Sequence, residues 1–145
     1  EGSMPSMLQV LASKGSHVWS ISPDATVFAG LTLMADKNIG ALLIIENDKP
    51  VGIMSERDYA RKIILEGRSS RDTRIRSIMT TRLVWAHPSD SVEHAMALMT
   101  RERIRHLPVV DGDSILGMVS IGDLVKAMID QQQFTIEQLE RYIAT

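Results

Sequence analysis

Two copies of one short motif hold the side chains of this sequence that are best placed for chemistry. The pattern Gly-x-x-Ser-x-x-Asp occupies residues 52–58 and, 65 residues later, residues 117–123. In each copy a short apolar run leads to the serine, and a helical pattern begins before the aspartate. A carboxylate at this place can accept hydrogen bonds from both hydroxyls of a ribose, while the serine hydroxyl and the free amides of the helix start can face a phosphate. This chemistry suits a nucleotide.

The same motif has a purely structural interpretation. A serine followed three residues later by an acid is the signature of a capping box, with Ser55 as the N-cap and Asp58 at the third helical position. Two features favour a ligand-binding role in addition. Both copies have aspartate where glutamate suits a capping box better, and both have glycine three residues before the serine. The two interpretations stay open at this stage.

The motif belongs to a longer internal repeat. Residues 18–64 align with residues 83–129 without a gap, and the identical pairs include Met34 with Met99. A repeat of this length indicates a duplicated structural unit. One unit cannot bury the apolar face of its sheet alone, so we expect the two units to pack together.

Hydrophobic periodicity predicts strand, helix, strand, turn, strand and helix in each repeat. In the first repeat we expect strand 18–21, a helix from Asp24 or Thr26 to about Asp36, strands 40–45 and 51–54, and a helix from Ser55 to about Gly67. In the second we expect strand 83–86, helix 91–103, strands 106–110 and 115–119, and helix 121–131. The predicted fold class is α+β, with two tandem β-α-β-β-α repeats.

Further segments lie before, between and after the repeats. The expected division is residues 1–15 for an expression remnant (Glu1-Gly2-Ser3) with a short helix from Ser6 to Lys14, 16–66 for repeat 1, 67–82 for a linker, 83–131 for repeat 2, and 132–145 for a short C-terminal helix. The last helix is predicted to open with a capping box at Thr135.

Composition removes several classes of function. The chain has no cysteine, which excludes disulfides and thiolate chemistry, and the spacing of its four histidines suggests no metal site. No apolar run is long enough to span a membrane and no signal-peptide pattern is present, so a cytoplasmic location without a membrane partner is expected.

The net charge of −2 does not suggest that the protein binds nucleic acid. Residues 57–82, however, contain eight Arg or Lys against three acids. A protein-interaction or nucleic-acid-binding module that uses this region is the alternative.

The sequence resembles a known family, the paired cystathionine β-synthase (CBS) domains that form a Bateman module. The resemblance depends on the two motif copies, on residues 105–111 with their counterpart 40–46, and on the Ile78-Met79-Thr80 turn, and it covers about residues 15–130. It implies two repeats packed about a pseudo-twofold axis, with two clefts that bind adenosine-containing ligands. It also implies a homodimer.

The resemblance implies two sets of site residues. In one cleft Asp123 would bind the ribose, with Ser120 and His106 near the phosphate. The adenine would lie against the backbone of Ser16, His17, Val18, Ile39, Gly40 and Ala41. In the other cleft Asp58 would bind the ribose and Ser55 would lie near the phosphate. Thr81, Ile104 and Arg105 would complete it, and Arg57 or Arg105 would compensate for the phosphate donor that this cleft lacks. Because alanine stands at position 41 where the second repeat has His106, we expect tighter phosphate binding in the Asp123 cleft.

The predicted function is therefore a regulatory module without catalytic residues or a catalytic cofactor. The expected ligand is AMP, with ATP, ADP or NAD as alternatives, and the other expected partner is an unidentified regulated protein. An enzyme would need a general base in a water-excluding pocket, and the sequence offers no such arrangement.

Overall fold

The computed structural model describes residues 4–144 and divides into two compact units. The first-repeat unit is Val18–Leu83, and the second-repeat unit combines the chain up to His17 with the chain from Val84 onward. The expected remnant at residues 1–3 lies outside the described residues. The N-terminal helix therefore belongs to the unit of the second repeat, although the whole first repeat separates the two in sequence.

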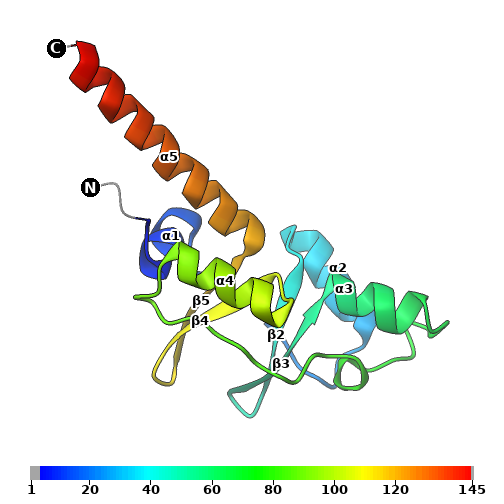
Figure 1. Ribbon diagram of the computed structural model, residues 1–145. Helices are drawn as coiled ribbons and strands as arrows, with labels where there is room; N and C mark the ends of the chain where they lie inside the picture. The colour runs from blue at the N-terminus through cyan, green and yellow to red at the C-terminus, as the bar shows by residue number, and fades with distance from the viewer. Residues whose placement is uncertain (1–3, 145) are drawn as a thin grey trace. The chain divides into compact units, whose positions relative to one another are not determined.

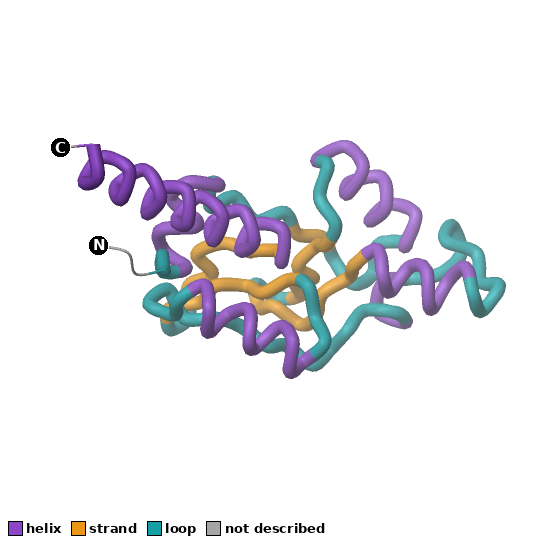
Figure 2. The backbone as a smooth tube through the Cα atoms, turned by 45° about the horizontal axis from the view of Figure 1, so that its top comes forward, coloured by secondary structure: helices purple, strands orange, loops and turns teal. Residues whose placement is uncertain are grey.

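The first-repeat unit contains a three-stranded sheet in the order β1-β2-β3, with strands shown in orange in Figure 2. β1 (Ser20–Ile21) is parallel to β2 (Ala41–Glu46), and β2 is antiparallel to β3 (Lys49–Ser55). Asn47 and Asp48 connect β2 to β3 with φ values of 52° and 63°. A two-residue hairpin turn needs this left-handed backbone, and Asn and Asp tolerate it better than most residues.

The helices of this unit begin at the predicted caps. α2 (Val27–Lys37) starts after Thr26, whose hydroxyl accepts a hydrogen bond from the Ala29 amide at 3.1 Å. α3 (Glu56–Tyr59) starts after Ser55 and continues as a π-helical turn, η1 (Ala60–Ile64). The sequence predicted one regular α-helix as far as Gly67, whereas the structure has a wider π-helical turn after Tyr59.

The segment 67–82, expected as a linker, packs on the first repeat. Its short helix η2 (Ile75–Ser77) begins with Ile75, and both Ile75 and Ile78 are buried. Backbone hydrogen bonds tie the segment to the start of α2, among them the bond from the Val27 amide to the Thr73 carbonyl at 2.8 Å. These isoleucines complete the core of the unit, which also contains Met34, Leu42, Ile44 and Met54.

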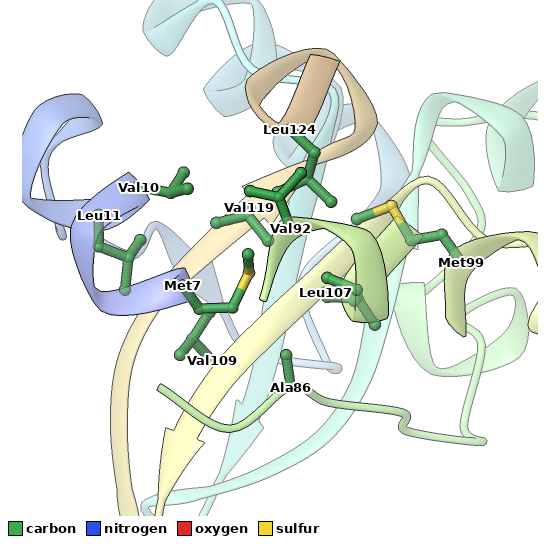
Figure 3. Packing of buried hydrophobic residues seen from close by; sticks show 11 residues of the cluster. Met7, Val10, Leu11, Ala86, Val92, Met99, Leu107, Val109, Val119 and Leu124 are labelled. Atoms are coloured by element: carbon green, nitrogen blue, oxygen red, sulfur yellow. The ribbon is translucent and has the colours of Figure 1, made fainter. Parts of the chain in front are cut away.

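The second-repeat unit is built from three helices and one hairpin. Its elements are α1 (Met7–Lys14), α4 (Val92–Glu102), β4 (His106–Asp111), β5 (Ser114–Ser120) and α5 (Ile121–Ala144). Side chains from all of them meet in one apolar core (Figure 3). The buried members of this core are Met7, Val10, Leu11, Ala86, Val92, Ala95, Met99, Leu107, Val109, Val119 and Leu124.

The two hairpins have equivalent registers. His106 pairs with Ser120 as Ala41 pairs with Ser55, and one register shift interrupts each ladder at the equivalent place. The predicted α+β class is confirmed.

The predicted strand 83–86 is wrong and is reduced to one bridge at Ala86. In the first repeat the Leu43 amide donates to the Trp19 carbonyl at 3.2 Å and extends the parallel ladder. Pro108 occupies the position equivalent to Leu43 and has no N–H to donate. The ladder therefore cannot extend toward residue 84.

The predicted short C-terminal helix is also wrong as a separate element, because α5 continues through it as one helix of 24 residues (Figure 1). The Thr135 hydroxyl donates to the Gln131 carbonyl at 3.1 Å, inside the helix, instead of capping a new one. Residues 123–144 contain no glycine or proline that would end the helix.

Candidate functional site

Both Gly-x-x-Ser-x-x-Asp motifs form reciprocal helix caps. The Ser55 amide donates to Asp58 Oδ2 at 3.0 Å, and the Asp58 amide donates to Ser55 Oγ at 3.2 Å. In the second copy the Ser120 amide donates to Asp123 Oδ2 at 2.7 Å and the Asp123 amide donates to Ser120 Oγ at 3.1 Å. The capping interpretation thus holds for both copies, and a ligand-binding role depends on what else each carboxylate contacts.

The Asp58 carboxylate is buried and its two oxygens already have protein partners. Its Oδ1 accepts a hydrogen bond from Thr80 Oγ1 at 3.0 Å and lies 3.1 Å from the Lys62 ammonium, while Oδ2 faces the Ser55 amide and hydroxyl. Only 7% of Asp58 is exposed. A carboxylate offers about four acceptor positions, so a ribose would have to replace one of these donors.

The Asp123 carboxylate is more accessible and has fewer partners. Lys14 Nζ, at the end of α1, lies 2.5 Å from Asp123 Oδ2 and also donates to the Met118 carbonyl at 2.6 Å. The described hydrogen bonds of this carboxylate all involve Oδ2, and 25% of its side chain is exposed. Burial raises the pKa of Asp123, but hydrogen bonds from Lys14 and Ser120 and the Lys14 charge together place it below its ordinary value. The group is thus an anionic acceptor with one oxygen available to a ligand.

His106 lies beside this carboxylate. It is the first residue of β4 and pairs with Ser120 in the hairpin, so the two side chains lie on the same face. Its pKa is lowered from the ordinary value, chiefly because burial disfavours the charged ring and also because of the positive charges of Lys14 and Arg105, while Asp123 opposes the shift. The structure therefore brings together the predicted residues His106, Ser120 and Asp123.

Sequence reasoning did not find Lys14. The only local signal was a lysine in the last turn of the predicted helix, immediately before Gly15. Its contact with Asp123 spans 109 residues of sequence, and no local pattern reveals such a contact.

The glycines of the two motifs explain how these partners reach the aspartates. A Cβ on Gly52 would lie 2.9 Å from the Thr80 carbonyl, and Thr80 is the residue that donates to Asp58. A Cβ on Gly117 would lie 2.6 Å from Leu11 on α1, one turn before Lys14. In each repeat, therefore, the absent side chain lets a second segment approach the strand, and that segment supplies the donor to the aspartate.

The other predicted residues are divided between the units. Ser16, His17, Ile104 and Arg105 belong to the second-repeat unit, and Val18, Ile39, Gly40, Ala41, Arg57 and Thr81 belong to the first-repeat unit. Ile39 and Gly40 line an open pocket of about 290 Å³ with Met34 and Glu56. Because each predicted set draws on both units, it remains a prediction.

The arginine-rich region is largely occupied by contacts within its own unit. Arg76 forms ion pairs with Glu46 and with Asp24, which raise the pKa of Arg76 and lower that of Glu46. The Arg71 guanidinium lies 3.8 Å from the centroid of the Phe28 ring. These contacts weaken the alternative in which residues 57–82 bind nucleic acid.

Residues 4–144 contain no group of three or more His, Asp or Glu side chains that could hold a metal ion. In the same part of the chain, no helix has the length and apolar character that crossing a membrane requires.

The chain matches the family model of the CBS domain twice, over residues 14–65 and 75–130. It is 41% identical over 137 residues to CBS domain-containing protein CBSX3, mitochondrial, of Arabidopsis thaliana, with 91% of this chain and 66% of that protein covered. A CBS-domain protein from Burkholderia ambifaria MC40-6 has a similar structure, with 46% identity, a TM-score of 0.84, and coverage of 90% of this chain and 98% of that one.

The CBS-domain pair of protein MJ0100, solved in complex with 5-methylthioadenosine and S-adenosyl-L-methionine, has a TM-score of 0.78. It is 22% identical and covers 88% of this chain and 98% of that one, so the likeness shows the fold alone. The chain belongs to the CBS-domain family, with one domain in each repeat. CBS-domain pairs are regulatory modules.

Proposed function

We propose that this protein is a regulatory module that binds an adenine nucleotide, foremost AMP, with ATP, ADP or NAD as alternatives. The observation that carries the proposal is the cluster of Asp123, Ser120, His106 and Lys14 at one end of the β4–β5 hairpin. It combines an anionic acceptor for a sugar diol with an imidazole, a hydroxyl and an ammonium suited to a phosphate. The adenosine compounds bound to the MJ0100 pair support the same ligand class.

In the proposed complex Asp123 accepts hydrogen bonds from the ribose hydroxyls. Ser120 and His106 contact the phosphate, and the backbone at 16–18 and 39–41 holds the adenine. Lys14 then exchanges its contact with the carboxylate for one with the phosphate. The cluster therefore favours a ligand that has both a diol and a phosphate.

The second proposed site, at Asp58, binds a nucleotide less readily than the site at Asp123. Its carboxylate is buried and bonded to Thr80 and Lys62, and Ala41 replaces the histidine of the other site. A nucleotide at this site, completed by Thr81, Ile104, Arg105 and Arg57, has to replace existing donors. We therefore propose that the Asp123 site has the higher affinity.

The proposed mechanism is a population shift. A nucleotide that contacts residues of both units stabilises one arrangement of them, and a partner protein recognises that arrangement. We further propose a homodimer, a cytoplasmic location, and no reaction catalysed by the chain itself.

Isothermal calorimetry of Asp123→Ala tests the proposal. A carboxylate that bonds a diol contributes about 1.5–3 kcal/mol, so we expect AMP affinity to fall about tenfold or more. Asp113→Ala, in the exposed β4–β5 turn, is the matched control and should bind AMP as the unchanged protein does. Thermal-shift titration with AMP, ADP, ATP and NAD then ranks the ligands. Unchanged AMP affinity in Asp123→Ala, or no shift with any of the four, contradicts the proposal.

A further inference from the structure

One face of α5 forms an exposed apolar stripe. Along it Val125, Ile129, Ile136, Leu139 and Ile143 are 39, 58, 49, 57 and 81% exposed. With Gln132, they define what we call the α5 stripe. Their spacing alternates four and three residues, which is the a and d pattern of a coiled coil, with isoleucine at each a position from 129 to 143.

The stripe is distinct from the face of α5 that packs on its own unit. Leu124 is buried in the core of the second-repeat unit, and Ile121, Ala127 and Met128 pack against that core. From residue 131 to 144 no described side chain of α5 is buried, and Figure 1 shows this half of the helix extending away from α1 and α4. An isolated helix of about 12–15 residues is only marginally stable in water, so this half needs a partner.

The charges beside the stripe identify a second copy of the same helix as that partner. Lys126 and Glu140 both occupy e positions, which face each other across an antiparallel pair. In the register that uses the whole stripe, Lys126 of each copy lies near Glu140 of the other. The same register places Ile129 against Leu139, Gln132 against Ile136, and Val125 against Ile143.

Two other partners fit less well. In a parallel pair Lys126 and Glu140 would face the uncharged residues Ile121 and Thr135, so no charge pair would form. A membrane surface is disfavoured because residues 121–144 contain four acids and two bases, whereas helices that lie on membranes are rich in Lys and Arg.

We propose that the α5 stripes of two copies of this chain pair as an antiparallel two-stranded coiled coil. The inference rests on the proposed homodimer and does not depend on nucleotide binding. The inference identifies the surface through which the two copies make contact and the relative direction of the two helices.

Sedimentation analysis of single variants tests the surface. Ile136→Lys places a charge in the stripe and should shift the protein to monomer. Phe134→Lys is the matched control, because Phe134 is 50% exposed on the same helix but off the stripe, and it should leave the dimer intact. A dimer that survives Ile136→Lys overturns this inference and leaves the proposed homodimer standing, and a monomeric unchanged protein overturns both.

Charge reversal tests the direction. Lys126→Glu and Glu140→Lys should each weaken the dimer at low salt, and the double variant should restore it. If the double variant does not recover, the antiparallel register is wrong.

Single cysteines give an independent readout, because the chain has none of its own. In the antiparallel pair the two copies of residue 129 lie about 15 Å apart along the helix axes, too far for a disulfide. Ile129→Cys alone should therefore not cross-link, whereas a mixture of Ile129→Cys and Leu139→Cys chains should give the mixed disulfide. Cross-linking of Ile129→Cys with itself indicates a parallel pair and overturns the inference.

Discussion

Lys14 Nζ lies 2.5 Å from Asp123 Oδ2 and thereby connects the end of α1 to the first turn of α5. In the proposed complex this ammonium competes with a ribose for the carboxylate but attracts a phosphate. Lys14→Met removes the charge and keeps the length of the side chain. We expect this variant to bind adenosine more tightly and to have a smaller preference for AMP over adenosine. Each change should be up to about fivefold, because an exposed ion pair contributes up to about 1 kcal/mol.

Calorimetry with AMP and with adenosine measures both effects. Lys49→Met, at the exposed start of β3, is the control and should change neither affinity. If Lys14→Met leaves both affinities unchanged, the lysine has no part in the site.

The aspartates of the two motifs should differ in their contribution to stability. Asp58→Ala removes a helix cap, the acceptor of the Thr80 hydroxyl and the ion-pair partner of Lys62, whose ammonium keeps its hydrogen bond to the Ile78 carbonyl. We expect a loss of about 2–3 kcal/mol in the free energy of unfolding. Asp123→Ala removes a cap whose carboxylate is more exposed, with 25% of the Asp123 side chain accessible against 10% for Asp58, and should cost only about 1 kcal/mol.

Urea unfolding followed by tryptophan fluorescence can measure each unit separately, because Trp19 and Trp85 belong to different units. In a Trp85→Phe background the signal of Trp19 reports the first-repeat unit alone, and a Trp19→Phe background reports the other. Equal losses for the two alanine variants would show that the additional donors to Asp58 contribute little.

His106 should make the second-repeat unit less stable in mild acid. Its folded-state pKa is below the ordinary value of 6.5, with burial as the largest cause. As the pH falls below about 6.5, the unfolded chain therefore takes up a proton that the folded ring resists, and stability declines until the folded pKa is reached. We expect His106→Gln to remove this part of the decline in urea unfolding between about pH 7 and pH 5.

Lys14→Met supplies a second check on the same group, because the lysine charge helps to lower the pKa of His106. An NMR titration of the His106 ring should show a higher pKa in Lys14→Met than in the unchanged protein. A pKa at or above 6.5 in the unchanged protein would contradict the described burial.

The repeat and its hairpins could be predicted from the sequence because their signals are local. The 65-residue offset that aligns the motifs also relates the pairing of Ala41 with Ser55 to that of His106 with Ser120. Among the proposed ligand contacts, Ser120 and Asp123 belong to the repeated motif, whereas His106 was implied only by the family resemblance, because its equivalent position is Ala41. Strand pairing brings His106 to Ser120, and the helix cap at the start of α5 holds Asp123 against Ser120.

The wrong predictions have physical causes that local sequence patterns do not contain. Pro108 lies in a strand with good apolar character, and its missing N–H matters only once the strand has a neighbour. Thr135 fits a capping box, yet its hydroxyl bonds to the carbonyl four residues earlier. Lys14 required knowledge of tertiary packing.

Gly52 should be the less replaceable of the two motif glycines. In Gly52→Ala the new Cβ would lie 2.9 Å from the Thr80 carbonyl oxygen. Two backbone hydrogen bonds between Ile53 and Thr80, of 3.0 and 2.9 Å, resist any shift of that oxygen. We expect a loss of about 1–3 kcal/mol in the free energy of unfolding of the first-repeat unit, measured by urea unfolding. Thr80 also donates to Asp58, so Gly52→Ala and Asp58→Ala should cost less together than the sum of their separate effects.

Gly117→Ala is the matched comparison at the equivalent position of the second repeat. Its Cβ would meet the end of the Leu11 side chain at 2.6 Å, and a side chain can rotate where a bonded backbone cannot. The cost of Gly117→Ala should therefore be smaller, and it should affect the second-repeat unit. A Gly117→Ala protein less stable than Gly52→Ala would show that the packing of α1 on β5 is more rigid than the contact of Thr80 with β3. If the losses for Gly52→Ala and Asp58→Ala are strictly additive, Gly52 has no part in placing the Thr80 hydroxyl that donates to Asp58.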